Sequence, residues 1–432
     1  MIQLHYGDKS IELAIPAANI ARVIRPFDAP QGPDNRKQIR RALTGDAIES
    51  FRALIQGRNL LILTADATRD MPLADILPIL LAATNGCRTV RFLMCTGTHS
   101  ADAPQNVRLA EHIRQLAIAA GPSDPSITIH DCNSPNLIDA GSTAFGTPVR
   151  YHPILQQADA FFVLSDIKCH YFAGYSNPIK YFIPGACAFA TAEKNHSLAL
   201  DDRSTFGVHP WHRDPARRGN PLAADQLEAM LRIVGDRLVY ALTTVSTSGR
   251  IQFAAFGPAQ QASADAFDFV DHHNGHTVEP TDRLIVSCGG LPHDIDLYIA
   301  QRALELTQCA VADGGEILFL AACPGGVGEP HTLDEFYHAL TRPLDAILES
   351  ADRPYKLFSH KPVKFARMIR RLRRIWMHSQ IPAEQIEAMH LFTTDNPQAV
   401  VDGWMAENPA VRIAVVDGAN KLAIYKKVSD TF

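Results

Sequence analysis

The first half of this sequence contains short, almost uninterrupted apolar runs, each of which stops at a cluster of polar residues. Three such runs span residues 59–64, 89–94 and 158–164. An apolar run of this length is typical of a strand buried on both faces of a parallel sheet. The segments at 72–81 and 104–120 between them each open with a proline and have the pattern of helices. Alternating strands and helices predict an α/β fold.

A polar cluster follows directly after each of these three runs. The clusters lie at residues 66–69, 96–99 and 165–170. The carboxyl ends of parallel strands meet at one edge of the sheet, and in open α/β sheets that edge binds ligands. We therefore expect the functional site of the first half to lie at this edge.

The alternating pattern restarts after about residue 280, so we expect a second domain. A chain of 432 residues is also long for one hydrophobic core. A polar stretch at 260–279 is the best candidate boundary, which gives domains at 1–265 and 266–432. We predict two α/β domains with mainly parallel sheets and an active-site cleft between them. The later elements are expected at residues 284–287 (strand), 294–306 (helix), 316–321 (strand) and 411–416 (the last strand).

The charge and cysteine content of the chain exclude several classes of protein. The formal net charge of −5 argues against a nucleic-acid binder, and we interpret the basic run at 364–374 as a solvated helix face. No apolar run approaches the roughly 20 residues that span a bilayer. None of the eight cysteines forms a CxxC pair, and the N-terminal segment lacks the pattern of an export signal. We expect a cytoplasmic protein with reduced thiols.

The polar clusters, together with the segment that follows them, contain an anion-binding residue, several imidazoles and an amine. Most of the 18 histidines must be surface or core residues. The candidates differ from these because they are placed together after strand ends, near Gly97, Gly174 and Gly185, which allow close backbone approach. The candidate functional residues are Asp66, Thr68, Arg69, His99, His170, Lys180 and His196.

The order and spacing of these residues resemble those of the nickel-dependent lactate racemases. That family has a histidine, a lysine ten residues on and a second histidine sixteen residues beyond the lysine, which matches His170, Lys180 and His196. Further matching motifs are Asp-x-Thr-Arg at 66–69, Thr-Gly-Thr-His at 96–99, Ile-Pro-Gly at 183–185 and Gly-Gly-x-Pro-x-Asp at 289–294. The resemblance spans nearly the whole chain.

The resemblance implies a nickel pincer nucleotide as cofactor, which is a pyridinium mononucleotide whose two sulfur-containing arms help to bind nickel. His196 matches the protein ligand of the nickel, and imidazole suits this metal. Lys180 matches the lysine that anchors the cofactor, and for this chain a covalent and a non-covalent anchor both stay open. His99 and His170 match the pair of acid/base histidines. The other residues implied to bind the cofactor are Asp66, Thr68, Gly174, Ser176, Pro184 and Gly185.

The implied reaction is racemisation or epimerisation of a 2-hydroxy acid, within a cofactor-binding N-terminal domain that the C-terminal domain closes. The α-hydrogen of such an acid is very weakly acidic, so its removal as a proton is costly. Its removal as hydride by the cofactor is therefore favoured. One histidine then accepts the hydroxyl proton and the other donates one. Arg69 is expected to hold a carboxylate or a phosphate, and the residues leave this choice open. The implied partners are the small hydroxy acid and, transiently, the proteins that make the cofactor.

The sequence departs from the family pattern at several places. Asn177 and Pro178 replace the usual glycines, so the nucleotide contacts there are expected to differ. In the segment that faces substrate, Tyr298 is kept, but Ile299 replaces a glutamine and Arg302 replaces a lysine. Losing a hydrogen bond and gaining a planar guanidinium predict a substrate other than lactate. The late active-site tryptophan of the family is also absent from its position.

The same residues allow several other interpretations. One is sugar-acid 2-epimerisation by the same chemistry, and another is an inactive member that binds an anion or stores cofactor. The retained histidines and lysine argue against the second, and the absence of an HExxH motif argues against a zinc hydrolase. We interpret the histidines at 272–276 as part of a solvated linker and the glycine-rich segment 323–328 as a turn lining the cleft. Cys169 and Cys187 are expected to pack rather than to bind metal.

Overall fold

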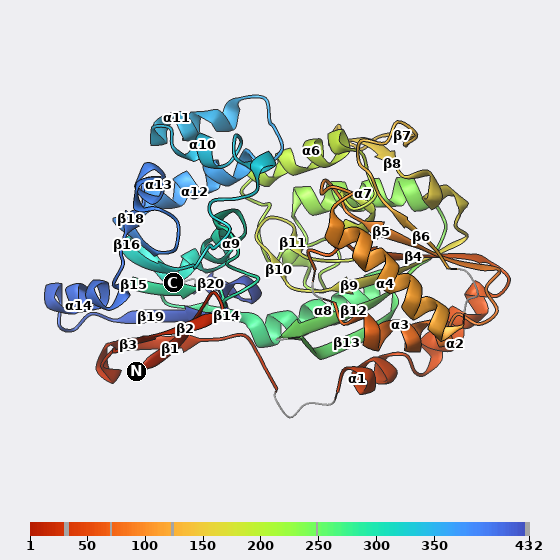
Figure 1. Ribbon diagram of the computed structural model, residues 1–432, viewed down its shortest axis with the longest axis horizontal. Coiled ribbons are helices and arrows are strands. Elements are labelled where there is room, and N and C mark those ends of the chain that lie inside the picture. The colour runs from red at the N-terminus through yellow and green to blue at the C-terminus, as the bar shows by residue number, and fades with distance from the viewer. Residues whose placement is uncertain (30–33, 70, 122–124, 248, 428–432) are drawn as a thin grey trace. The chain divides into compact units, whose positions relative to one another are not determined.

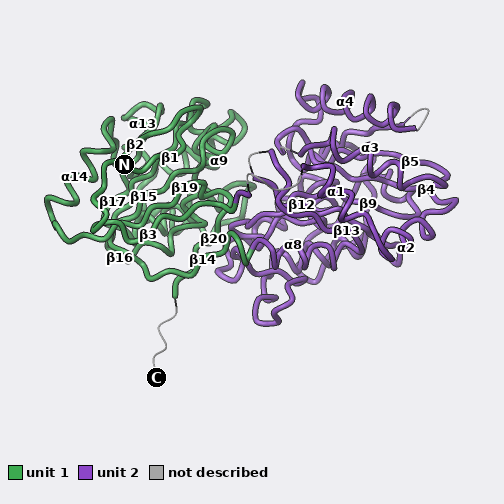
Figure 2. Tube along the Cα trace, turned by 90° about the horizontal axis from the view of Figure 1, so that it is seen from below, with its two compact units in different colours: residues 1–27, 271–432 green, residues 28–270 purple. Residues whose placement is uncertain are grey.

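The computed structural model describes residues 1–29, 34–69, 71–121, 125–247 and 249–427. The chain forms two compact units, shown in Figure 2: unit 1 combines residues 1–27 with 271–432, and unit 2 is residues 28–270. Each unit contains a six-stranded, mainly parallel sheet with helices packed on it. The predicted α/β fold class is confirmed.

The sheet of unit 2 has the strand order β13-β12-β9-β4-β5-β6 (Figure 1). All neighbouring pairs are parallel except β12 with β13. From β4 the chain adds β5 and β6 on one side and then returns to add β9, β12 and β13 on the other. The strand order therefore reverses between β4 and β9, which is where open α/β sheets bind ligands. The strands are β4 (Asn59–Ala65), β5 (Thr89–Cys95), β6 (Ser126–Ile129), β9 (Ala160–Asp166), β12 (Val239–Thr247) and β13 (Arg250–Pro258).

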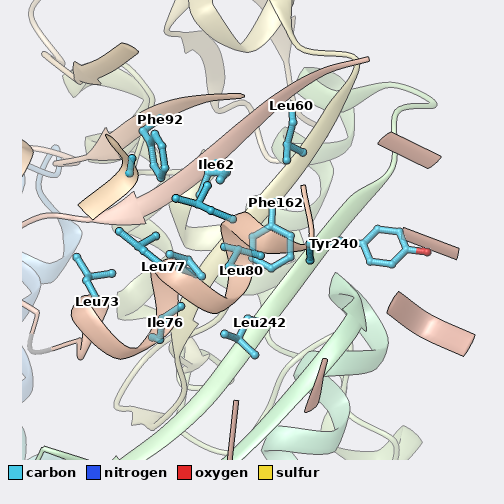
Figure 3. Packing of buried hydrophobic residues seen from close by; sticks show 14 of the residues in the cluster. Leu60, Ile62, Leu73, Ile76, Leu77, Leu80, Phe92, Phe162, Tyr240 and Leu242 are labelled. Atoms are coloured by element: carbon cyan, nitrogen blue, oxygen red, sulfur yellow. The ribbon is translucent and has the colours of Figure 1, made fainter. Parts of the chain in front are cut away.

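One face of this sheet packs against four helices. Figure 3 shows Ile62, Phe92 and Phe162 from three neighbouring strands in contact with Leu77 and Leu80 of the third helix. Residues two apart along a strand point to the same face, so every second residue of these strands enters this core. Burying each such side chain fully contributes about 1.5–3 kcal/mol. The helices are α1 (Asn35–Ala42), α2 (Asp46–Ile55), α3 (Leu73–Ala82) and α4 (Pro104–Ala120).

The opposite face of the sheet is covered as well. Phe161 of β9 meets Phe182 of α5 edge to face, with 5.4 Å between ring centroids, and α5 packs on α7. The strands are thus buried on both faces, which explains their continuous apolar sequences. The remaining elements of unit 2 are β7 (Ile138–Ser142), β8 (Pro148–Tyr151), β10 (Cys169–His170), β11 (Gly174–Tyr175), α5 (Ile179–Phe182), α6 (Phe189–Ser197), α7 (Pro221–Val234) and the first part of α8 (Ala259–Asn274).

Unit 1 joins the two ends of the chain in one parallel sheet with the order β18-β17-β16-β15-β19-β3. In Figure 1 the red strand β3 lies beside the blue strand β19. Hairpin β1–β2 and helix α14 cover one face, where Leu4, Val415 and Trp404 share a core. Helix α9 packs against β15.

The elements of unit 1 follow the predicted positions closely, with additions at both ends. Its strands are β1 (Ile2–Tyr6), β2 (Lys9–Leu13), β3 (Ile20–Ile24), β14 (Gly275–Val278), β15 (Thr281–Ser287), β16 (Val311–Leu320), β17 (Arg374–His378), β18 (Phe392–Thr393), β19 (Ile413–Asp417) and β20 (Ala423–Lys426). Its helices are α9 (Leu297–Thr307), α10 (Tyr337–Leu340), α11 (Leu344–Glu349), α12 (His360–Arg371), α13 (Ala383–Ala388) and α14 (Pro397–Glu407).

The units differ from the predicted domains, 1–265 and 266–432, because residues 1–27 belong with the C-terminal part. Strand β3 completes the sheet of unit 1 by pairing with β19. The division between the units at 270/271 does fall within the predicted boundary stretch 260–279. That stretch is not a linker, however, because most of it is helix α8, several of whose polar residues lie on its outer side. Strand β20 follows β19, so the run at 411–416 is not the last strand.

Two predictions about the surface can be compared with the structure. Arg367, Arg370 and Arg373 of the basic run are exposed, which confirms the solvated face. Among the described residues, no helix has the length and the apolar character needed to cross a bilayer.

Candidate active site

The three polar clusters predicted at strand ends lie together at the carboxyl edge of the unit 2 sheet. Strand β4 pairs with β5 on one side and with β9 on the other, all in parallel. Asp66 follows β4 directly, His99 lies four residues after β5, and Asp166 ends β9. Since β4 and β9 flank the reversal of strand order, this edge has the position that open α/β sheets use for ligands.

The shortest polar contact at this edge joins Asp66 and His99. The His99 Nδ1 lies 2.6 Å from the Asp66 Oδ2, and the Thr68 hydroxyl donates to the Asp66 Oδ1 at 2.6 Å. Asp66 is buried, which raises its pKa, but the hydrogen bonds from His99 and Thr68 and the charge of His99 outweigh burial and lower it. An ionised Asp66 makes the His99 Nδ1 the protonated nitrogen, so the Nε2 carries the lone pair.

Arg69 extends the same turn towards solvent. Its backbone N–H donates to the Asp66 carbonyl oxygen at 3.2 Å, and its side chain is exposed. Its charge acts on Asp66 and also on Tyr181, whose pKa burial raises and Arg69 partly lowers. An exposed guanidinium beside the switch point is suited to hold an anion.

His170 lies on a short hairpin formed by β10 and β11. In this hairpin His170 pairs with Gly174, and the His170 Nδ1 accepts a hydrogen bond from the Ala173 N–H at 3.3 Å. Gly174 has φ +77°, and a Cβ at this position would collide with the Val208 carbonyl. Because the His170 Nδ1 is the acceptor, the proton of the neutral ring is on Nε2. His99 and His170 therefore present opposite functions: a lone pair and a proton.

The ring of Phe172 lies close to the three residues of this segment that match the family pattern, His170, Lys180 and His196. Its centroid lies 4.5 Å from that of His170 and 5.4 Å from that of His196, both edge to face, and 6.0 Å from the Lys180 Nζ. Phe172 is buried. The sequence reasoning did not select it, since an aromatic residue within an apolar segment has no local sign of this role.

His196 lies near the end of helix α6. Its Nδ1 is 2.8 Å from the Ala192 carbonyl oxygen and donates to it, so the Nε2 carries the lone pair. Metal-binding histidines are commonly oriented in this way by a second hydrogen bond. The preceding Asn195 donates to the buried carboxylate of Asp225 at 2.7 Å, which ties α6 to α7.

The segment that carries Lys180 shows how this chain accommodates its departure from the family pattern. The Asn177 side chain accepts from the Ile179 N–H at 2.9 Å, and Pro178, at φ −57°, leads into helix α5. Pro178 is thus placed where proline is favoured, at the start of a helix. The Ser176 hydroxyl donates to the Asp166 carbonyl oxygen at 2.8 Å and accepts from the Lys168 N–H at 2.9 Å.

The turn at Pro184 and Gly185 connects this segment to the His99 loop. The Gly185 N–H donates to the Lys180 carbonyl oxygen at 2.9 Å, and the Gly97 N–H donates to the Gly185 carbonyl oxygen at 3.0 Å. A Cβ on Gly185 would lie 2.6 Å from the Lys180 carbonyl oxygen, so only glycine fits. These hydrogen bonds fix the position of the loop after Lys180 relative to the loop that carries His99.

A buried donor also lies near Lys180. The His209 Nδ1 accepts from the Trp211 N–H at 3.1 Å, so the proton is on Nε2, which has no hydrogen-bond partner among the described residues. Burial, followed by the charges of His212 and Lys180, lowers the pKa of His209 to about 3. Buried donors without partners are rare, and a ligand with acceptor atoms would satisfy this one.

The chemistry of these residues fits the implied cofactor. Among the described residues, no group of three or more His, Cys, Asp and Glu side chains could hold a metal. A nickel ion whose other ligands come from a cofactor needs one imidazole, and His196 has the required lone pair.

The remaining predicted residues belong to unit 1. Tyr298, Ile299 and Arg302 lie in the first two turns of helix α9, whose N-cap is Asp296. The segment 323–328 forms the turn that holds this helix start, with the Leu297 N–H donating to the Gly326 carbonyl oxygen at 3.0 Å.

The histidines at 272–276 and the two cysteines beside the lysine segment were the other residues considered as ligands. The histidines at 272–276 lie at the end of α8 and in β14 and belong to no metal-binding group among the described residues. Cys169 and Cys187 are buried, as expected for residues that pack.

A doubly wound sheet with a carboxylate–histidine pair at its switch point is typical of an α/β enzyme that uses acid/base chemistry. Residues 6–207 match the lactate racemase N-terminal domain. The chain is 26% identical to the lactate racemase of Thermoanaerobacterium thermosaccharolyticum over 336 residues, or 76% of this chain and 75% of that protein. It is 22% identical to the lactate racemase of Lactiplantibacillus plantarum over 384 residues, or 85% of each.

The fold has solved counterparts. The lactate racemase apoprotein of T. thermosaccharolyticum superposes with a TM-score of 0.83 at 22% identity, covering 98% of this chain and 99% of that one. A Thermotoga maritima protein has a TM-score of 0.65 at 15% identity, covering 91% and 99%. The chain is thus similar to the lactate racemases, by the family match of residues 6–207 and by its fold over nearly its whole length. These relatives indicate an isomerase.

Proposed function

We propose that this chain racemises or epimerises a 2-hydroxy carboxylate other than lactate, with a nickel pincer nucleotide anchored by Lys180 and ligated by His196. The observation that carries the proposal is the opposite hydrogen bonding of the two histidines. The His99 Nδ1 donates to Asp66, whereas the His170 Nδ1 accepts from Ala173. One ring is therefore ready to accept a proton and the other to donate one.

The two protonation states match the two half-reactions. Oxidation of the substrate removes the hydroxyl proton, which the His99 Nε2 accepts, and the ionised Asp66 then stabilises the imidazolium. When bound, the cofactor supplies the acceptor for the hydride of the α-carbon, which the side chains of the protein cannot supply. Reduction of the planar 2-keto acid needs a proton on its oxygen, and the His170 Nε2 donates it. The His99 side chain is 45% exposed, so its proton can exchange with solvent.

Arg69 is assigned to the anionic end of the substrate or to the cofactor phosphate, since its guanidinium is exposed beside Asp66. The eight cysteines are all free thiols, which supports a reducing compartment such as the cytoplasm. The cofactor must reach the chain from other proteins, and we propose only transient contact with them.

The substrate class is tested with single enantiomers. Nickel-loaded enzyme should interconvert the enantiomers of larger or more acidic 2-hydroxy acids and act poorly on lactate. Ile299 cannot form the hydrogen bond of the glutamine that it replaces, and the planar guanidinium of Arg302 differs in shape from the ammonium of the lysine that it replaces. Chiral chromatography of lactate, malate, longer-chain hydroxy acids and an aldonate gives the preference. Conversion of the aldonate alone would favour sugar-acid epimerisation.

The Ile299→Gln/Arg302→Lys double variant is the matched comparison for this substrate panel. It should shift the preference towards lactate. Lactate as the best substrate of the wild type, or an unmoved preference in the double variant, would reject this interpretation of the pocket.

The anchoring role of Lys180 is tested separately by intact mass. Denatured wild-type protein from a host that makes the cofactor should show added mass. Lys180→Ala should show none, because the proposed covalent bond to the cofactor is formed by the Lys180 Nζ. Lys37→Ala, at a remote position on α1, should keep the adduct. Wild-type protein without added mass would leave only the non-covalent anchor.

A further inference from the structure

Asp225 is a buried acidic residue that the reaction described above does not use. It lies in the second turn of helix α7 and is 0% exposed. An aspartate is almost never buried to this degree unless its carboxylate is paired or hydrogen-bonded, because removing the charge from water is unfavourable. The hydrogen-bond partners of Asp225 therefore show what it holds together.

Three side chains donate hydrogen bonds to the Asp225 carboxylate. The Thr143 hydroxyl donates to the Oδ1 at 2.5 Å, and the Thr147 hydroxyl and the Asn195 amide donate to the Oδ2 at 2.8 and 2.7 Å. The two threonines begin and end the turn between β7 and β8, and Asn195 lies in the last turn of α6. Figure 1 shows these elements side by side with α7. The carboxylate thus joins α6, α7 and the β7–β8 hairpin.

The Asn195 side chain is engaged at both of its polar atoms. Besides its bond to Asp225, the Nδ2 donates to the Leu222 carbonyl oxygen at 3.2 Å, and the Oδ1 accepts from the Gln226 side chain at 3.1 Å. Asn195 and Gln226 are both fully buried. A buried polar network whose members bind one another in this way rigidifies the structure around it. The last turn of α6 is therefore fixed against the first two turns of α7.

His196 directly follows Asn195, so its position depends on this connection. Successive residues of a helix point about 100° apart, so Asn195 can face α7 while His196 projects from a different side of α6. The ring centroid of His196 lies 5.4 Å from that of Phe172. Helix α7 holds this residue as well, since its N-cap Asn220 donates to the Phe172 carbonyl oxygen at 2.9 Å.

Apolar packing alone could hold α6 against α7 equally well. Replacing a buried polar network by apolar residues of similar volume is often neutral or stabilising, so stability gives no reason for this carboxylate. Hydrogen bonds are directional, however, and fix the rotation of a helix about its own axis. A metal ligand needs this precision, because its lone pair must point at the metal.

We propose that Asn195 and Asp225 are positioning residues for the metal site, which fix the rotation of α6 so that the His196 Nε2 stays directed at nickel. The inference rests on the function proposed above, in which His196 is the ligand. Neither side chain touches the metal or the cofactor, and both act through α6. Residues that orient a metal ligand typically contribute tenfold to a hundredfold in metal affinity.

The first measurement is the rate at which loaded protein loses nickel to a chelator. Asp225→Asn and Asn195→Ala should each raise this rate by about tenfold to a hundredfold. Thr147→Val removes one donor to the carboxylate and should also raise it, whereas Thr147→Ser keeps the hydroxyl and should retain the wild-type rate. If Asn195→Ala does not fold, Asp225→Asn and the two Thr147 variants carry the comparison.

Thr243→Val is the control for a general loss of stability. It removes a buried hydrogen bond between β12 and α8, from the Thr243 hydroxyl to the Ala262 carbonyl oxygen at 2.8 Å. Thr243→Val and Thr147→Val should lower the melting temperature by similar amounts, since each loses one buried hydrogen bond. Only Thr147→Val should speed nickel loss. Equal nickel loss in the two variants would overturn the inference.

Amide hydrogen exchange in the full chain without cofactor gives a measurement that does not depend on nickel. Peptides that cover α6 should exchange faster in Asp225→Asn than in wild type and should be unchanged in Thr243→Val. If the wild type binds no nickel but α6 exchange still depends on Asp225, the positioning of α6 is supported and the nickel assignment is rejected. If the wild type holds nickel and Asp225→Asn changes neither exchange nor nickel loss, the proposed function is supported and the positioning role is rejected.

Discussion

An Asp66→Asn variant is expected to lose on the order of 10³ to 10⁴ of the racemisation rate while keeping its fold. The Asp66 Oδ2 accepts from the His99 Nδ1 at 2.6 Å. The asparagine amide can donate a hydrogen bond to the His99 Nδ1. The Nδ1 would then be the acceptor, and the ring proton would be on the Nε2. His99 would lose the lone pair that accepts the hydroxyl proton. Steady-state rates in both directions, followed by chiral chromatography, measure the effect.

The pH dependence of this loss is a further check. The pKa of Asp66 is lowered from its ordinary value of 3.8, so its stabilising interaction with His99 is present above that value and is lost only as the pH falls through the lower folded pKa. Asp66 should therefore stay ionised between about pH 5 and 9, so its own titration should not alter the defect in this range. Asp159→Asn is the control: this aspartate accepts from the Asn59 N–H at the opposite edge of the sheet and should have no effect on rate. A wild-type rate in Asp66→Asn would remove the pair from the mechanism.

His196→Ala is expected to lose nickel almost completely, whereas wild-type protein from a cofactor-producing host should carry about one nickel per chain. The His196 Nδ1 donates to the Ala192 carbonyl oxygen, so the Nε2 is the proposed ligand atom that the substitution removes. Metal analysis of purified protein by mass spectrometry gives the occupancy directly.

Two other histidine variants calibrate this result. His170→Ala should keep nickel but lose about 10² to 10⁴ in rate, because it removes a proton donor and not a ligand. His112→Ala, at an exposed position on α4, should keep both. Unchanged nickel in His196→Ala would contradict the assignment of this residue as ligand.

Much of the fold was predictable because its signals are local. A strand buried on both faces requires a continuous apolar run, and β4, β5 and β9 were all recognisable in this way. Strand β3 was not predicted from the sequence, and its partner β19 lies near the other end of the chain. The prediction also failed at α8, because polar residues on the outside of a helix look like those of a linker. Pairing across long sequence distances has no local signature.

The sequence by itself determined the α/β class, the edge of the sheet proposed to bind ligands and the residue types at that edge, since motif spacing and apolar runs are properties of neighbouring residues. Only the tertiary structure decided which atoms meet. Asp66, expected to contact the cofactor, uses both of its carboxylate oxygens on His99 and Thr68. Asp225, buried against Asn195, had no distinguishing signal in its helical segment. A side chain's protonation and function depend on partners brought together by packing, and sequence order does not specify those contacts.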